Sequence, residues 1–265
     1  MSNYFTFMRK ELIENLRTKR LLVLGCVFLF FAITSPLLTR YMGEFLAFVM
    51  PAGDEMGQAL IEVMQDPQWQ GPQWFESYAQ LYSSLGQIGI WAVLFMYMGT
   101  VQREVSTGTA SLMFSKGLGF GSFIFAKFTM AVMLTTVITV VSTFVTYGYT
   151  FLLFDEAGQI GNILVGSLVF SLGTLMLLSI IILCSSLTKS SAVSGGLSLG
   201  AYFVLIISAA IPRIGRFSPQ NLFSYPVVIS TGHFADEFMV STLLAAAVAV
   251  IALFVATERL KKAEG

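Results

Sequence analysis

Residues 160–187 read IGNILVGSLVFSLGTLMLLSIIILCSSL and contain no Asp, Glu, Lys, Arg or His. A helix needs about 20 predominantly apolar residues to cross the hydrocarbon core of a bilayer, and this run is long enough. Five more uncharged runs of suitable length follow the same pattern, at residues 21–39, 81–101, 128–150, 192–211 and 239–257. The sequence therefore predicts an all-α polytopic membrane protein with six transmembrane helices.

The overall composition supports this fold class. The 265 residues are 55% hydrophobic and only 11% charged, with a mean hydropathy of +0.77. Soluble domains carry about 25% charged residues, so this chain lacks the charge to cover a water-exposed surface. Disordered and disulfide-rich secreted classes are excluded as well. Because both cysteines, Cys26 and Cys184, lie in apolar runs, we expect no structural disulfide.

The basic residues predict how the chain is oriented. Six spans place both termini on the same side of the membrane, and twelve of the fifteen Lys and Arg residues lie on that side. The three on the opposite side are Arg40, Arg213 and Arg216. Loops rich in Lys and Arg stay in the cytoplasm, so the sequence predicts that both termini are cytoplasmic.

The first twenty residues precede the transmembrane domain, which we assign to residues 21–265. Phe5, Met8, Leu12 and Leu16 recur at helical spacing, with charged residues between them. This pattern predicts an amphipathic elbow helix over residues 1–20 that lies along the cytoplasmic membrane face. A simple basic anchor that fixes orientation is the alternative.

Two outer segments stand out from ordinary loops. Residues 40–80 form an acidic extracytoplasmic insert, for which two short helices are expected, one around Phe45 and Phe48 and one from Met56 to Met64. A structural cap is one interpretation of this insert, and a binding site for an extracytoplasmic protein is another. The following helix is expected to run unbroken from about Gln73 to Val101. Residues 212–238 combine prolines with apolar residues, which favours a re-entrant element.

Several kinds of chemistry are missing from the sequence. It has no GxxxxGK[ST], HExxH, CxxC or GxSxG motif, and its lone histidine, His233, is expected to be solvated or at an interface. We therefore predict no catalytic residue, no metal site, no directly bound cofactor and no nucleic-acid partner. No ionisable residue lies within the six uncharged runs, where transporters driven by ion gradients usually keep one. Energy for any transport must come from a partner on the cytoplasmic side.

Within the predicted spans, residues with hydroxyl groups form a regular pattern. Thr135, Thr139, Ser142 and Thr146 form one stripe of the third predicted helix. Close helix packing through small and hydroxyl residues explains such a stripe. A translocation path lined by hydroxyls is the alternative.

The chain resembles a known family, the membrane subunits of ABC-2-type transporters, in the order of several short motifs. This group includes bacitracin-resistance, sodium-export and nitrous-oxide-reductase-maturation permeases. The first segment, Arg9-Lys10-Glu11-Leu12 followed by Arg17, is similar to the family's amphipathic start. The cytoplasmic loop at residues 102–127 is similar to the family's first cytoplasmic loop, through Glu104, Gly108-Thr109, Ser115-Lys116 and Ala126-Lys127-Phe128. Phe217-Ser218-Pro219 resembles an element before the last span, whereas Gly117 stands where many relatives have Pro.

This resemblance implies a permease without ATPase activity of its own. A cytoplasmic ABC ATPase subunit would bind ATP and Mg, and a second permease subunit, identical or a sister chain, would complete the transporter in the lipid bilayer. The plasma membrane of a bacterial or archaeal cell is the implied location. The residues implied to contact the ATPase are Glu104, Gly108, Thr109, Leu112, Met113, Phe114 and Lys116.

Three functions follow as hypotheses. The leading one is the permease subunit of an ATP-driven exporter. The second is a mechanotransducing permease that moves an extracytoplasmic partner bound at residues 40–80 without bulk transport. The third is an ATP-independent membrane scaffold or receptor.

Overall fold

The computed structural model describes residues 2–49, 71–211, 213, 215–233 and 237–264. Nearly all of these residues are helical, and none of them lies in a strand. Six helices of the described chain are long and apolar enough to cross a membrane, which confirms the predicted number. The protein is therefore an all-α chain of the multi-pass membrane class.

The spanning helices are α2 (Arg20–Arg40), α5 (Trp74–Ser84) with the helical residues that follow it up to Ser106, α9 (Phe120–Phe154), α10 (Ile160–Leu187), α11 (Ser191–Ala210) and α13 (Phe238–Glu264). Four of the spanning helices are longer than the uncharged runs that predict them, whereas α10 and α11 have the same lengths as their runs. The 35 residues of α9 span about 52 Å at 1.5 Å per residue, against about 30 Å of hydrocarbon. Both ends of such a helix have to extend past the hydrocarbon core.

The second spanning helix differs from the unbroken helix expected from Gln73 to Val101. After α5 the backbone becomes π-helical at η1 (Leu85–Gly89), continues as α6 (Ile90–Tyr97) and then turns. A Cβ at Gly89 would lie 3.3 Å from the Phe28 ring of α2, so a glycine allows the two helices to approach closely here. A π-helical turn adds a residue to the helix and changes the direction of the faces beyond it.

Two short helices flank α2. Helix α1 (Ser2–Arg17) precedes it, separated by a break at Lys19, whose φ is +57°. Helix α3 (Met42–Val49) follows it and corresponds to the first short helix expected in the 40–80 insert. The second expected helix, from Met56 to Met64, falls outside the described residues.

Helix α10 is the most buried of the spanning helices, and it packs against α9, α11 and α13. The largest core cluster combines aliphatic side chains with aromatic ones, among them Phe28, Tyr78, Tyr82, Phe170 and Phe223. The segment between α11 and α13 forms η2 (Gly215–Phe217), η3 (Pro219–Phe223) and α12 (Tyr225–Ser230). Its Leu222 and Ile229 are buried against α10 and α13, so the segment packs on protein; its insertion into a membrane remains a prediction.

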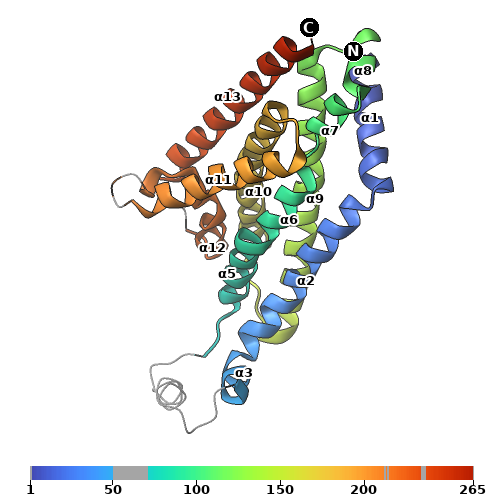
Figure 1. Cartoon of the computed structure of the whole chain (residues 1–265). Coiled ribbons are helices and arrows are strands. Elements are labelled where there is room, and N and C mark those ends of the chain that lie inside the picture. The colour runs from blue at the N-terminus through green and yellow to red at the C-terminus, as the bar shows by residue number, and fades with distance from the viewer. Residues whose placement is uncertain (1, 50–70, 212, 214, 234–236, 265) are drawn as a thin grey trace.

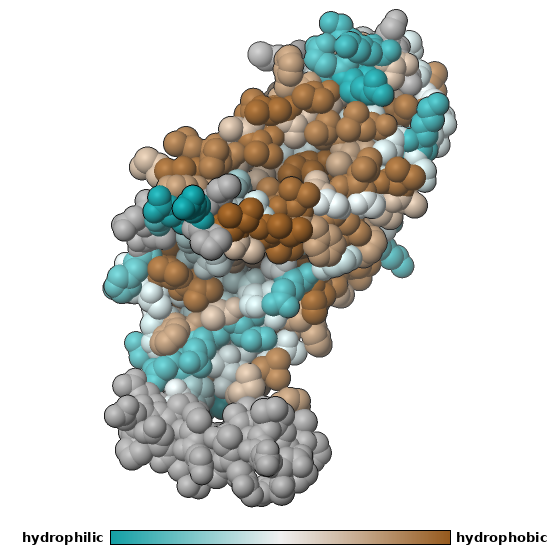
Figure 2. Space-filling view, turned by 60° about the vertical axis from the view of Figure 1, so that its left-hand side comes forward, coloured by the Kyte–Doolittle hydropathy of each residue, from teal (hydrophilic) through white to brown (hydrophobic). Residues whose placement is uncertain are grey.

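The molecular surface separates apolar and polar regions. On the face shown in Figure 2, a broad band of apolar side chains lies next to a hydrophilic end, and hydrophilic residues become frequent again toward the opposite end. The beginning of α1 and the end of α13 lie at the same end of the molecule (Figure 1), as an even number of spans requires.

Candidate functional site

Two short helices connect the second and third spans at the end that carries both termini (Figure 1). They are α7 (Gln102–Ser106) and α8 (Thr109–Ser115), and we call them the α7–α8 hairpin. Gly108 separates them with a φ of +72°, and Gly117 follows α8 with a φ of +86°. These left-handed positions suit glycine and allow two tight changes of chain direction.

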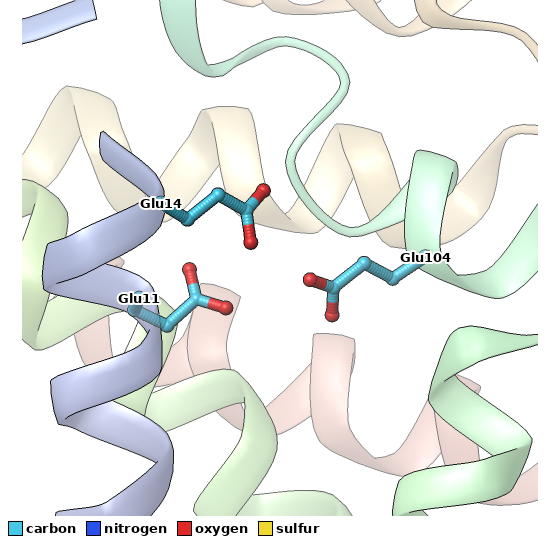
Figure 3. Close-up of side chains that lie close together, drawn as sticks. All are labelled: Glu11, Glu14 and Glu104. Carbon is cyan, nitrogen blue, oxygen red and sulfur yellow. The ribbon is translucent and has the colours of Figure 1, made fainter. Parts of the chain in front are cut away.

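A network of five charged side chains lies beneath this hairpin, and we call it the ion network. Glu104 of α7 accepts from Lys10 of α1 at 2.5 Å and pairs with Lys127 of α9 at 3.1 Å, through the same oxygen, Oε1. Lys127 also donates to Glu11 of α1 at 2.9 Å, and Lys10 pairs with Glu14 at 2.9 Å. Figure 3 shows Glu11, Glu14 and Glu104 pointing toward one another. The network joins α1, α7 and α9.

The centre of the ion network is almost completely removed from solvent. Lys127, Glu11 and Glu104 are 3%, 4% and 8% exposed. The Lys127 ammonium also lies over the rings of Phe7 and Phe123, 5.7 Å and 5.1 Å from their centroids. Removing one member of a buried ion pair commonly costs about 3–5 kcal/mol, because the other charge stays buried without a partner. The three helices are therefore strongly held together at this point.

The network carries three carboxylates and two ammonium groups. Burial alone would lower the pKa of Lys10, but its hydrogen bonds to Glu104 and Glu14 outweigh burial and raise that pKa above its ordinary value. Burial would raise the pKa of Glu14, and the hydrogen bond from Lys10 outweighs this and lowers it. Both shifts favour the charged forms, so the Lys10–Glu14 pair stays ionised across the physiological pH range.

The three carboxylates lie close enough together to hold a metal ion. However, the Nζ atoms of Lys10 and Lys127 both contact Glu104 Oε1, and the two lysines also contact Glu11 Oε1. Ammonium groups of the chain itself thus provide the positive charge at the point where the carboxylates meet. We interpret the site as a structural ion network.

Hydrogen bonds tie the hairpin to two further helices. The backbone amides of Val101 and Gln102 both donate to Ser185 Oγ of α10 at 3.1 Å. The Gln102 side chain donates to the Lys189 carbonyl at 2.7 Å and accepts from Ser191 Oγ of α11 at 2.8 Å. With the ion network included, α7 contacts α1, α9, α10 and α11.

Helix α8 is buried on one side and open on the other. Ala110 is fully buried, and Phe114 stacks near Phe120 and Phe123 with centroid distances of 4.4 Å and 5.4 Å. Leu112, in contrast, is 66% exposed. Met113 lines a cavity of about 390 Å³ together with residues of α1 and the end of the hairpin, namely Thr6, Phe7, Lys10, Lys116 and Leu118.

The structure thus divides the residues predicted to contact an ATPase. Leu112 and Lys116 are exposed, whereas Glu104 lies inside the ion network. Gly108, Thr109, Met113 and Phe114 are half-buried. A partner that reaches the hairpin from outside would meet Leu112 and Lys116 first, and Glu104 would respond only through α7.

The segment predicted as an elbow helix is helical, but its polar side faces the protein. Glu11, Asn15 and Phe7 are buried, whereas Phe5 and Leu16 are exposed at 68% and 53%. Arg9 and Arg17 are exposed as well, and Leu12 is half-buried. The exposed side of α1 therefore carries apolar as well as basic side chains, and its buried side carries Glu11 of the ion network.

The four residues of the hydroxyl stripe on α9 are completely buried within the chain. Thr146 Oγ1 donates to the Ala32 carbonyl of α2 at 3.0 Å, and Thr139 Oγ1 donates to the Thr135 carbonyl at 2.9 Å. Neighbouring Thr143 lies 3.4 Å from the hydroxyl of Tyr82 in α5. These contacts fit the helix-packing interpretation of Thr135, Thr139, Ser142 and Thr146.

Sequence reasoning missed the role of Lys127 in the ion network. A lysine directly before a long apolar run was a signal that a carboxylate partner lies nearby, since a buried ammonium needs one. The partners themselves, Glu11 and Glu104, lie 116 and 23 residues earlier in the chain, so the sequence could not identify them. Both cysteines are free, as expected, and His233 is exposed.

The sequence was also compared with known proteins. No protein-family model matches the chain, and no curated protein matches it. A function must therefore be inferred from the ion network, the hairpin and the order of sequence motifs.

Proposed function

We propose that the chain is the transmembrane permease subunit of an ATP-binding-cassette exporter, driven by separate nucleotide-binding subunits. In this proposal both termini are cytoplasmic, α1 is the interfacial elbow helix, and the α7–α8 hairpin receives the ATPase. ATP and Mg bind to the partner subunit. The main support is the position of α7, which is held by buried ion pairs and hydrogen bonds to α1, α9, α10 and α11.

The contacts of α7 suggest how force would be transmitted. Leu112 is exposed on the hairpin, where an apolar groove of a partner can take it up. A displacement of α8 passes directly to α7, because only Thr107 and Gly108 separate them. The buried pairs of Glu104 are costly to break, so α7 moves together with α1 and α9. Rearrangement of these helices would then open or close a path across the membrane.

A second permease subunit is part of the same proposal. Helix α11 is the least buried of the spanning helices, and Ala192, Gly196 and Gly200 follow one another on its exposed side at four-residue spacing. A Cβ at Gly196 or Gly200 would meet no atom within 4 Å. Small residues at this spacing allow the backbones of two membrane helices to approach closely.

Capture of the partner tests the proposal. The tagged chain, expressed in its native host, is expected to retain a subunit that carries a Walker A motif, and reconstitution of the pair is expected to give ATPase activity. Leu112→Glu should abolish capture, because it places a charge on the exposed apolar contact. Ala263→Glu is the matched control, since it adds the same charge to an exposed residue at the same end of the molecule.

Two results would contradict the proposal. One is a chain that never retains an ATPase and is unaffected by Leu112→Glu, which would favour the scaffold or receptor hypothesis. The other is complete transport by the chain reconstituted alone. Circular dichroism of both variants shows whether their helical folds are intact.

A further inference from the structure

A second cavity lies at the end of the molecule opposite the ion network, where α5 and α10 begin and α9 ends. Its volume is about 730 Å³, within the range of small-molecule binding sites. Side chains from α5, α9, α10 and the connection after α9 line it, and α12 closes it with the residues that follow. Neither the hairpin nor the ion network contributes to this cavity.

The lining combines aromatic rings with acidic groups. Trp74, Tyr147 and Phe151 contribute rings, and Asp155 and Glu156 contribute carboxylates. No lysine or arginine belongs to the described residues that line the cavity. Among the residues that the structure describes, neither Asp155 nor Glu156 takes part in a salt bridge. Within the described part of the chain, the cavity therefore carries two carboxylates without a salt-bridge partner next to three aromatic rings.

The walls of the cavity are held in place by specific contacts. Trp74 packs directly against Gly158, where an added Cβ would lie 2.6 Å from the indole ring. Gly158 has a φ of +75°, so a larger residue is disfavoured there for two reasons. The Tyr78 hydroxyl donates to the Ala157 carbonyl at 2.9 Å and fixes the same connection to α5. Asp155 itself is held in the left-handed region, with a φ of +56°.

We propose that this cavity binds an organic cation, a quaternary ammonium or protonated amine with an apolar body. Aromatic faces attract such cations through their quadrupole, and the carboxylates add a direct charge interaction. An anion is disfavoured because it would meet two carboxylates without a counter-charge. This inference is independent of the proposed exporter function and concerns the opposite end of the chain.

Choline and 3,3-dimethylbutan-1-ol, its uncharged isostere, provide the test. Binding of each to the full-length chain in dodecyl maltoside, a detergent without a phosphocholine group, is measured by saturation-transfer NMR titration. We expect saturable binding of choline and binding of the isostere that is at least about tenfold weaker. Choline binding is expected to weaken as salt is added, since the two carboxylates are exposed.

Three variants locate the binding site. Asp155→Asn combined with Glu156→Gln removes the charge, and asparagine tolerates the left-handed backbone at position 155; we expect choline affinity to fall about tenfold. Phe151→Leu changes a ring that is 55% exposed and is expected to reduce affinity severalfold. Glu258→Gln removes one charge at the opposite end and should leave binding unchanged.

Several results would overturn the proposal. These are the absence of saturable choline binding, equal affinity for the uncharged isostere, and unchanged affinity in the double variant and in Phe151→Leu. Binding of a neutral oligosaccharide without binding of choline would assign the cavity to a different ligand class. The circular dichroism spectrum of each variant distinguishes a lost site from a lost fold.

Discussion

Lys127 and Asp155 lie near opposite ends of α9, and the chain places them in contrasting surroundings. Lys127 is 3% exposed and pairs with two carboxylates from other helices. Asp155 is exposed at the edge of a cavity, and no salt bridge connects it to the described part of the chain. Charge at one end holds helices together, and charge at the other end is free to meet a ligand.

This difference suggests different consequences for substitutions at the two ends. A buried, paired charge contributes to stability, because its removal leaves other charges buried alone. An exposed, unpaired charge contributes little to stability, so it can be changed without harm to the fold. The following predictions test this contrast, from the largest expected effect to the smallest.

Lys127→Met should have the largest effect, a loss of about 3–5 kcal/mol in the free energy of unfolding. The substitution keeps the length of the apolar stem but leaves Glu11 and Glu104 close together with only the Lys10 ammonium between them. SDS-induced unfolding followed by circular dichroism measures the change. Lys127→Met combined with Glu11→Gln should recover part of the loss. Single and double variants as stable as the native chain would show that the network does not hold the helices together.

Gly99→Ala should have an intermediate effect, a destabilisation of about 1–3 kcal/mol. An added Cβ would lie 2.6 Å from Ser191 Oγ and 3.0 Å from Arg103 Nε, just before the hairpin. Gly148→Ala in α9 is the matched comparison, because a Cβ there meets nothing within 4 Å, and we expect a gain of up to about 1 kcal/mol. The same unfolding measurement serves for both. If Gly99→Ala leaves the free energy of unfolding unchanged, the residues at the start of the hairpin can shift to accommodate the added Cβ.

A smaller effect is expected from pH. The pKa of Glu14 is lowered in the folded chain, so its contribution is present above the unfolded value of 4.5 and is lost as pH falls through the folded pKa. The pKa of Lys10 is raised, so its contribution is present below 10.5 and is lost only as pH rises through the folded pKa. Unfolding free energy should stay level from neutral pH to about 10.5 and decline in acid.

Glu14→Gln isolates the contribution of this carboxyl group. Because Glu14 is partly exposed, we expect the difference between the variant and the native chain to stay below about 1 kcal/mol at neutral pH and to disappear in acid. A difference that grows as pH falls would have the wrong sign for a lowered pKa and would contradict the ion pair with Lys10.

The smallest effect on stability is expected at the other end of α9. Asp155→Asn combined with Glu156→Gln removes two charges, yet the free energy of unfolding should change by less than about 0.5 kcal/mol. The same variant is expected to lose choline affinity. A large destabilisation would show that these carboxylates support the fold, and the contrast between the two ends would then disappear.

Much of the fold follows from hydropathy alone. Six uncharged runs predict six spanning helices, and the helix from Ile160 to Leu187 has the same limits in sequence and structure. The break within the second span, at Leu85–Gly89, was not predictable because it depends on the close contact between Gly89 and Phe28 of another helix. The apolar spacing in α1 correctly predicted a helix, but it did not show that Glu11 and Asn15 face the protein.

The candidate site likewise has parts that the sequence predicted and parts that it did not. The order of Glu104, Gly108 and Lys116 led to the prediction that residues 102–127 form a cytoplasmic loop that contacts an ATPase, and this stays a prediction. The sequence did not identify the partners of Glu104, because Lys10 and Lys127 reach it from two other helices. The second cavity had no sequence signal, since the residues that line it lie up to 158 positions apart, between Trp74 and Gly232.

Hydropathy alone predicts that the chain is helical and which segments can cross a membrane, because helices satisfy their backbone hydrogen bonds locally and apolar length is a property of each segment. The tertiary structure decided which charges are buried together and which remain free. That choice depends on contacts between distant segments, and the low-dielectric interior makes a charge favourable only where a partner of opposite sign meets it.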